Sequence, residues 1–134
     1  MRVQPINQNL SKIYKVPALR AKSLEDAVNK MLFFVKELSG EDAKIPTKFI
    51  EFPTSGSLSK LTLIYSSSAA SGDPQGRVLK LIGSRGSKSV STHIAVGNKS
   101  QIIDMLSKPT INSEIQQHGE NLKGMISSTH NPFI

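Results

Sequence analysis

The spacing of apolar residues changes partway along the chain, and this change constrains the fold more than any other feature of the sequence. Between positions 24 and 38, apolar residues recur every three or four positions, the period of one helix face: Leu24, Ala27, Val28, Met31, Leu32, Val35 and Leu38. Between positions 44 and 96 the spacing approaches two, with frequent β-branched residues and Gly or Pro punctuation. The chain is therefore predicted to combine a helix with a run of strands, because neither period suits the other structure.

The boundaries of the first helix are marked by capping residues. Ser23 is a natural N-cap, and Glu25 and Asp26 follow in the first turn, where carboxylates interact favourably with the helix dipole. Gly40 is expected to close the helix. Residues 1–22 have no clean period, and we expect an extended arm that is able to add an edge strand.

Phe33 interrupts the pattern of this helix. It falls on the face opposite the apolar stripe, near Asp26, Lys30 and Glu37. Two interpretations are open: the ring lies against the N-terminal arm or a loop, or it contacts a partner protein.

The period-two region predicts short strands over 47–52, 58–65, 77–82 and 89–96. In the last of them, one face is expected to carry Val90, Thr92, Ile94 and Val96 and the other Ser91, His93 and Ala95. The small-residue segment 66–76 is predicted to be a long loop, and residues 83–88 a hairpin connection.

Two further helices are predicted after the strands. Asn98 with Gln101 forms a capping-box pattern, and Lys108-Pro109 ends that helix before a last one in which Gly119 and Gly124 lower the helix propensity. The predicted fold class is α+β: an N-terminal helix, an antiparallel meander sheet of three to four strands, and two C-terminal helices packed on one face. We expect an arm over 1–22, one domain over 23–127 and a loose tail over 128–134.

Composition removes several classes of function. None of the 134 residues is cysteine, which excludes disulfide scaffolds, thiolate zinc ligands and thiol nucleophiles. The stretch MRVQPINQNLSKIYKVP lacks the apolar core of a signal peptide, and no run approaches the length of a membrane span. These features predict cytoplasmic synthesis without a membrane span. The stretch is also acid-free and rich in Asn, Gln, Ser and Ile, as bacterial type III secretion signals are, so leaderless export stays open.

The net charge of +7 favours an anionic partner such as nucleic acid, an acidic protein or a membrane surface. Acids gather near the first helix, whereas the predicted strands are mainly basic. Arg77, Lys80, Arg85 and Lys88 are the candidate polyanion-binding residues. No aromatic platform for stacked bases is expected on the strands, so phosphate contacts and shape would provide the binding.

His93 is the one candidate for catalysis. Strand alternation places it beside Ser91, with Lys80 or Arg77 on a neighbouring strand. A histidine near hydroxyl and cationic groups has the chemistry for phosphodiester cleavage without a metal. The alternative is an ordinary exposed or helix-covered histidine. The spacing of the histidines favours no metal site, and no cofactor motif is present.

Three functions follow in order of support. The first is a small, non-enzymatic protein-interaction module, with a leaderless secreted effector or adaptor as one form of it and Phe33 as its contact. The second is a nucleic-acid or other polyanion-binding domain, and the third a metal-independent ribonuclease that uses His93. The element order broadly resembles that of small basic ribonuclease toxins, an analogy of fold that transfers no residue role.

Overall fold

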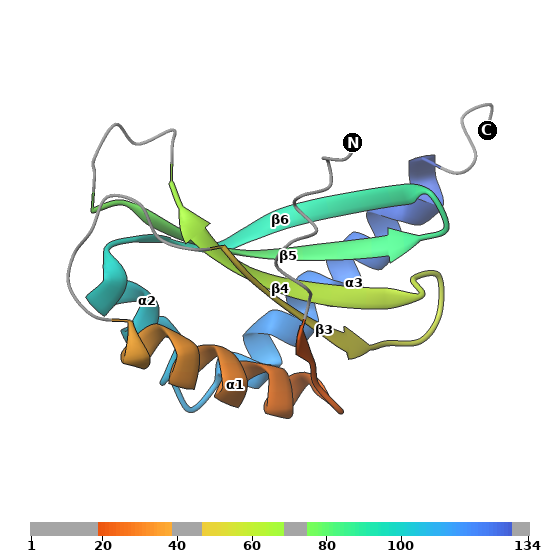
Figure 1. The fold of residues 1–134 in the computed structure, drawn as a ribbon. Helices are drawn as coiled ribbons and strands as arrows, with labels where there is room; N and C mark the ends of the chain where they lie inside the picture. The colour runs from red at the N-terminus through yellow and green to blue at the C-terminus, as the bar shows by residue number, and fades with distance from the viewer. Residues whose placement is uncertain (1–18, 39–46, 69–74, 130–134) are drawn as a thin grey trace, which may run out of the picture.

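The computed structural model describes residues 19–38, 47–68 and 75–129 (Figure 1). Along the chain the elements are β2 (Leu19–Arg20), α1 (Leu24–Glu37), β3 (Lys48–Pro53), β4 (Lys60–Ser67), β5 (Arg77–Arg85), β6 (Lys88–Gly97), α2 (Lys99–Leu106) and α3 (Ile111–Thr129). The α+β class is confirmed. Residues 1–18 of the predicted arm and 130–134 of the predicted tail lie outside the described residues, whereas residues 128 and 129 belong to α3.

The sheet has five strands in the order β2-β3-β4-β5-β6 and is mixed. The meander from β3 to β6 is antiparallel, as expected, but β2 pairs with β3 in parallel through Leu19 with Ile50 and Arg20 with Glu51. The sheet therefore has one parallel edge strand more than the predicted antiparallel meander. This strand comes from the end of the arm that was expected to be able to add one, and it precedes the helix that was predicted to come first. A parallel neighbour needs a crossover, which α1 provides. A strand of two residues is too short to show a period.

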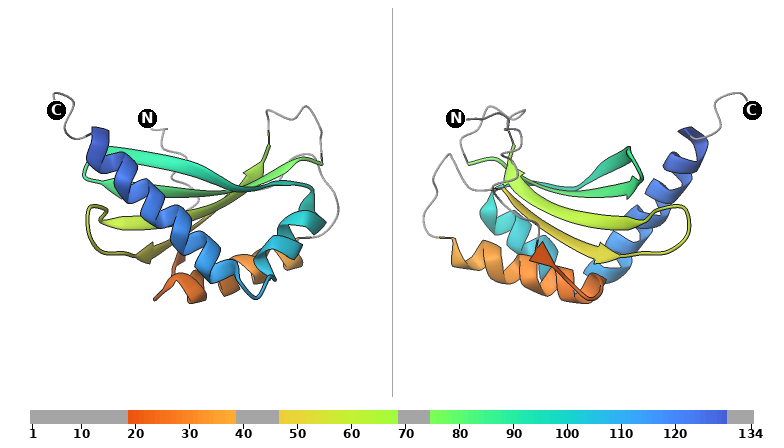
Figure 2. Two further views of the ribbon diagram at one scale, coloured as in Figure 1. Left: turned by 180° about the vertical axis from the view of Figure 1, so that it is seen from behind. Right: turned by 45° about the vertical axis from the view of Figure 1, so that its right-hand side comes forward.

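All three helices cover one face of the sheet, as the views from behind and from the side show (Figure 2). The core lies between the two layers. Ile50, Leu63 and Leu81 form one cross-strand row on the covered face and are fully buried. Ile102 of α2 and Ile115 of α3 belong to the same buried cluster. The described elements thus share a single core.

The start of α1 is formed by the predicted cap. The Asp26 N–H donates to Ser23 Oγ over 3.2 Å. The buried residues of α1 are Ala27, Val28, Met31 and Val35, while Leu32 is only half-buried at the edge of the stripe. Leu38 forms the C-cap, and Gly40, the predicted end, lies outside the described residues.

For the second half of β6, the predicted assignment of side chains to the two faces of the sheet is wrong. We expected Val90, Thr92, Ile94 and Val96 to share one face. Instead, Leu79 pairs with Ala95 and Lys80 with His93, so that Ile94 is an extra residue in a β-bulge. The bulge reverses the alternation beyond it, and Val96 is 55% exposed on the side away from the helices.

The predicted capping box of α2 is confirmed. The Gln101 N–H donates to Asn98 Oδ1 over 2.9 Å, and the Asn98 N–H donates to Gln101 Oε1 over 2.8 Å. Lys99 Nζ donates to the carbonyl of Leu38, a favourable position for a cation at the C-terminus of α1. The contact of Lys99 therefore joins α2 to the end of α1.

Candidate functional site

An apolar groove of about 430 Å³ lies between α1 and the edge of the sheet formed by β2 and β3. It is lined by Leu19, Asn29, Lys30, Phe33, Phe34, Glu37 and Lys48. The Phe33 side chain is 68% exposed and Leu19 is 39% exposed. Phe33 therefore points away from the core, as its position in the helix period predicted. The sequence pattern did not indicate Leu19 and Lys48 as groove residues, because the groove forms only when β2 lies beside β3.

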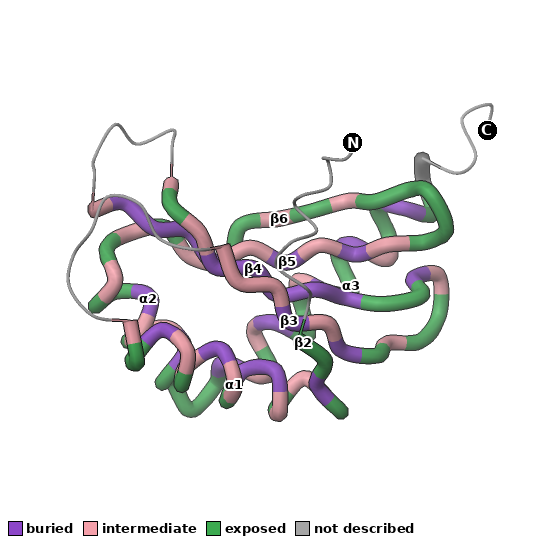
Figure 3. Tube along the Cα trace, viewed as in Figure 1, coloured by how far each residue is buried: buried purple, intermediate pink, exposed green. Residues whose placement is uncertain are grey.

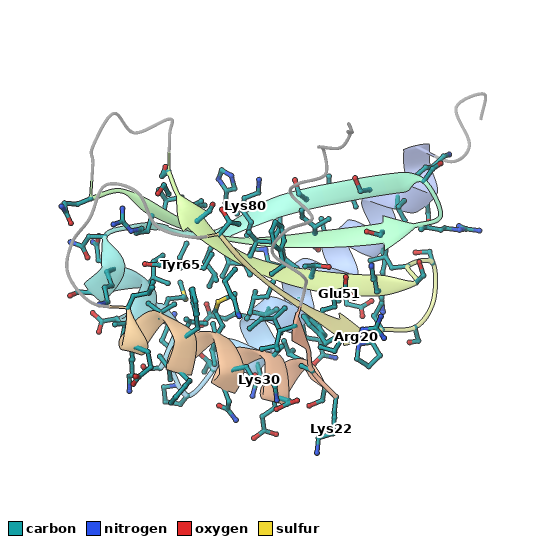
Figure 4. The ribbon with its side chains drawn as sticks, viewed as in Figure 1. Arg20, Lys22, Lys30, Glu51, Tyr65 and Lys80 are labelled. Atoms are coloured by element: carbon teal, nitrogen blue, oxygen red, sulfur yellow. The ribbon has the colours of Figure 1, made fainter. Side chains whose placement is uncertain are left out.

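The floor of the groove is attached to the core through an aromatic pair. Phe34 meets Tyr65 edge to face, with ring centroids 6.4 Å apart and an interplanar angle of 77°. Tyr65 is buried between the sheet and the helices (Figure 4). The Lys48 ammonium group lies 5.0 Å from the centroid of the Phe34 ring. These contacts hold Phe34 in place, while Phe33 next to it stays exposed.

The rim of the groove carries charges of both signs. Lys30 Nζ lies 3.0 Å from Asp26 Oδ1, one turn apart on α1 (Figure 4 labels Lys30). The backbone N–H of Lys22 donates to Asp26 Oδ2 over 2.9 Å. This backbone hydrogen bond, followed by the one from Lys30, lowers the pKa of the Asp26 carboxyl below its ordinary value of 3.8. Asp26 is therefore held ionised at the N-terminus of the helix.

The four predicted polyanion-binding residues do not share one surface. Arg77 is 2% exposed, and its Nη1 donates to the carbonyl of Gly76 over 2.8 Å. A guanidinium group so deeply buried is not available to a phosphate in solution. Arg77 is therefore not part of the candidate surface.

The other three cations lie on β5 and β6. Arg85 and Lys88 are register partners beside a two-residue turn in which Gly86 has a φ of 60°, and both are exposed. Lys80 is half-buried and lies on the face of the sheet away from the helices (Figure 4). By strand alternation, Arg85 and its partner Lys88 belong to the same face of the sheet as the core residue Leu81, opposite to the face that carries Lys80, so the three cations do not form one continuous surface.

His93 lies directly opposite Lys80 in the sheet register, and Ser91, two residues before it, lies on the same face of the sheet, away from the helices. Ser91 and His93 are both exposed. The predicted proximity of these three residues is therefore present, whereas Arg77 pairs with Gly97 at the far end of β6. No hydrogen bond joins the side chains of Ser91, His93 and Lys80 to each other in the described structure.

A second cavity, of about 420 Å³, lies between the β3–β4 connection and α3. Here a Cβ on Gly119 would lie 3.3 Å from Leu61 Cδ1, so the absence of a side chain permits close packing of α3 on β4. Ser57 Oγ donates to the carbonyl of Lys123 over 3.1 Å and joins the connection to α3. The glycine that lowers the helix propensity therefore has a packing role that the helix period alone did not reveal.

Residues 19–38, 47–68 and 75–129 bring together no group of three or more His, Asp or Glu side chains able to hold a metal ion. Over the same ranges, none of the helices combines the length and the apolar character needed to cross a bilayer.

The architecture defines an α+β protein whose five-stranded sheet carries the three described helices on one face. The chain matches no protein-family model, and no curated protein or solved structure is significantly similar to it.

Proposed function

We propose that this chain is a non-enzymatic protein-interaction module and that the groove between α1 and β2 is its contact surface. The observation that carries the proposal is the exposure of Phe33, whose side chain is 68% accessible beside an apolar wall. When a partner covers such an aromatic ring, the apolar surface of the ring is removed from water, and this burial favours binding.

The groove has the composition of a contact surface with an apolar centre and a polar rim. Its centre is formed by Leu19, Phe33 and Phe34, and its rim by Lys30, Glu37 and Lys48. Aromatic residues contribute much of the binding energy of protein interfaces when they insert into a partner, whereas rim charges influence orientation. The occupant that suits this groove is a partner segment with an apolar side chain to place between Leu19 and Phe33.

The test compares two exposed apolar residues that lie on different helices. Phe33→Ala removes the proposed anchor, and Met125→Ala is the matched control, since Met125 is 46% exposed on α3. We expect a partner captured by the wild-type protein to be retained by the Met125 variant and lost by the Phe33 variant. Equal retention by all three proteins contradicts the proposal.

The module's role as a leaderless secreted effector or adaptor is part of the same proposal. Its support is the acid-free, Asn- and Gln-rich composition of residues 1–17. A fusion of residues 1–22 to a reporter should be exported by a bacterium with a type III secretion apparatus and retained when the apparatus is absent. Retention in both strains contradicts the secreted form but leaves the groove proposal intact.

A second candidate function, polyanion binding, is favoured by the exposed pair Arg85 and Lys88. Between positions 77 and 103 the chain carries basic residues and no carboxylate. Phosphate groups bind to such surfaces through long-range attraction and through release of counterions. This candidate is tested below by its dependence on salt.

A further inference from the structure

β6 forms one edge of the sheet and has an unusual length for an edge strand. It spans ten residues, whereas β2 at the opposite edge spans two. β6 is largely exposed or half-buried, in contrast to the buried β4 (Figure 3). Within the described chain no other strand pairs with its outer side. A long open edge of this kind is a template for one more strand.

One printed backbone contact establishes which groups of β6 face outward. The Ser59 N–H donates to the carbonyl of Ser84 over 2.7 Å, so the polar backbone groups of Ser84 point toward β4. Ser84 pairs with Ser89 of β6, and this pair is therefore a non-hydrogen-bonded one. The N–H and C=O groups of Ser89 then point away from β5, toward the open edge. By alternation, those of Ser91 and His93 do the same.

The charge around this edge indicates the kind of strand that would pair with it. Lys88 begins β6, Arg85 faces it across the turn, and Lys80 lies opposite His93. No carboxylate occurs between positions 77 and 103. A second copy of the chain would bring the same cations together, and each copy carries a net charge of +7. An acidic segment would instead complement them.

The bulge limits how far such pairing extends. Ile94 is the extra residue of β6, and a bulge disrupts the regular ladder and twists the strand. The regular part of the edge therefore runs from Lys88 to His93. Its outward backbone groups belong to Ser89, Ser91 and His93.

We propose that this part of β6 binds an extended acidic segment of a partner protein as an additional strand. Backbone hydrogen bonds to Ser89, Ser91 and His93 provide the pairing, and Arg85 and Lys88 provide the preference for acidic side chains. This surface lies at the edge of the sheet opposite the groove, so the inference stands independently of the proposed function of Phe33.

The experiment uses a fluorescent peptide of about eight residues that alternates Glu and Val, a length that suits a strand. Its counterpart replaces each Glu by Lys. Fluorescence anisotropy should show binding of the acidic peptide and at least about tenfold weaker binding of the basic one. Failure to bind the acidic peptide at low salt, or equal binding of both, overturns the proposal.

Two variants at one position separate backbone pairing from side-chain contact. Ser91→Pro removes an outward N–H at an edge position, where proline is tolerated, whereas Ser91→Ala keeps it. We expect the proline variant to bind the acidic peptide at least about tenfold more weakly and the alanine variant to bind like the wild type. Peptide binding that is unchanged in the proline variant overturns strand addition.

Amide hydrogen exchange of the wild-type protein makes the test independent of how well the proline variant folds. Addition of the acidic peptide should slow exchange at Ser89, Ser91 and His93, and leave Val90 and Thr92 unchanged because their N–H groups already face β5. No protection at the three outward amides overturns the proposal. Tighter binding of an oligonucleotide than of the peptide, with those amides still unprotected, would also overturn the proposal. That result would assign the surface to nucleic acid.

Discussion

Met31 and Phe33 are separated by two positions on α1 and have opposite environments. Met31 is completely buried in the core, whereas Phe33 is exposed in the groove. The stability of the fold and the proposed binding activity therefore depend on different faces of one helix. Substitutions on the two faces should be separable in their effects.

We predict that Met31→Ala lowers the free energy of unfolding by about 2–5 kcal/mol, because it leaves a cavity between α1 and the sheet. Phe33→Ala should change it by about 0.5 kcal/mol or less, as for other exposed sites. Leu32→Ala, at the edge of the stripe, should cost less than Met31→Ala, contrary to the central position that the helix period predicts. Urea unfolding measures all three, and equal losses at Met31 and Phe33 would contradict the assigned faces.

The ribonuclease hypothesis also depends on single residues. His93 and Lys80 are opposite each other in the register, and Ser91 shares their face. Because we propose a non-enzymatic function, we expect total RNA to stay intact when incubated with the wild-type protein in chelator. If RNA is cleaved, the His93→Ala variant decides whether His93 is responsible. Loss of cleavage without a change in melting temperature would establish a ribonuclease activity that depends on His93. The melting temperature should not change, because His93 is exposed and its truncation leaves the core intact.

At the scale of the element, carboxylates at the starts of α1 and α3 make ordered polar contacts. Asp26 accepts hydrogen bonds from the Lys22 backbone and from Lys30. At the start of α3, Glu114 lies 2.9 Å from Lys108, and Thr110 Oγ1 donates to the same carboxylate over 2.7 Å. The Lys108 contact, then that of Thr110, lowers the pKa of Glu114 below its ordinary value of 4.5. Both carboxylates are stabilised in their ionised form by the folded chain.

These lowered pKa values predict a loss of stability in acid. A carboxyl whose pKa is lower in the folded state stabilises the fold above its unfolded pKa and loses this contribution as the pH falls through the folded pKa. For Asp26 the loss therefore begins near its ordinary value of 3.8 and continues below it. Melting temperatures followed downward from neutral pH should fall less steeply for Asp26→Asn than for the wild type.

Glu25→Gln is the control for this acid effect. Glu25 lies in the same first turn of α1 and is exposed. Its substitution should leave the acid dependence of the melting temperature close to that of the wild type. An acid dependence that is equal in the wild type and in Asp26→Asn would show that the capping contacts of Asp26 do not contribute.

At the scale of the whole molecule, charge is distributed unevenly. The net charge is +7, yet Glu25, Asp26 and Glu37 lie on α1 while β5 and β6 carry no carboxylate. The two proposed surfaces therefore differ in character. The groove at the β2 edge is apolar with a mixed rim, and the β6 edge is cationic.

If polyanions bind to the β5–β6 surface, the double substitution Arg85→Gln and Lys88→Gln should weaken binding to duplex DNA. It should also reduce the log–log salt slope by about one to two units, because two phosphate contacts are lost. The matched control, Lys22→Gln with Lys36→Gln, removes the same net charge from exposed positions around α1. Equal effects of the two pairs would mean that net charge acts without a defined site.

Much of the helical structure was predictable because its signals are local. The Ser23 cap, the apolar stripe of α1 and the Asn98–Gln101 capping box lie within a few residues of one another, and each was confirmed. The exposure of Phe33 followed from the same period. Such contacts depend mainly on backbone geometry over one or two turns, so the order of residues is sufficient to indicate them.

Other features were decided by tertiary pairing. β2 consists of two residues that become a strand only beside β3, and the bulge at Ile94 is defined by the register between β5 and β6. The burial of Arg77 depends on the elements that surround it. In each case the controlling partner lies far away in the sequence, so the local alternation of residues could not indicate it. The sequence by itself determined the class of the elements and the capping of α1 and α2, and only the tertiary structure decided the edges of the sheet, where both proposed binding surfaces lie.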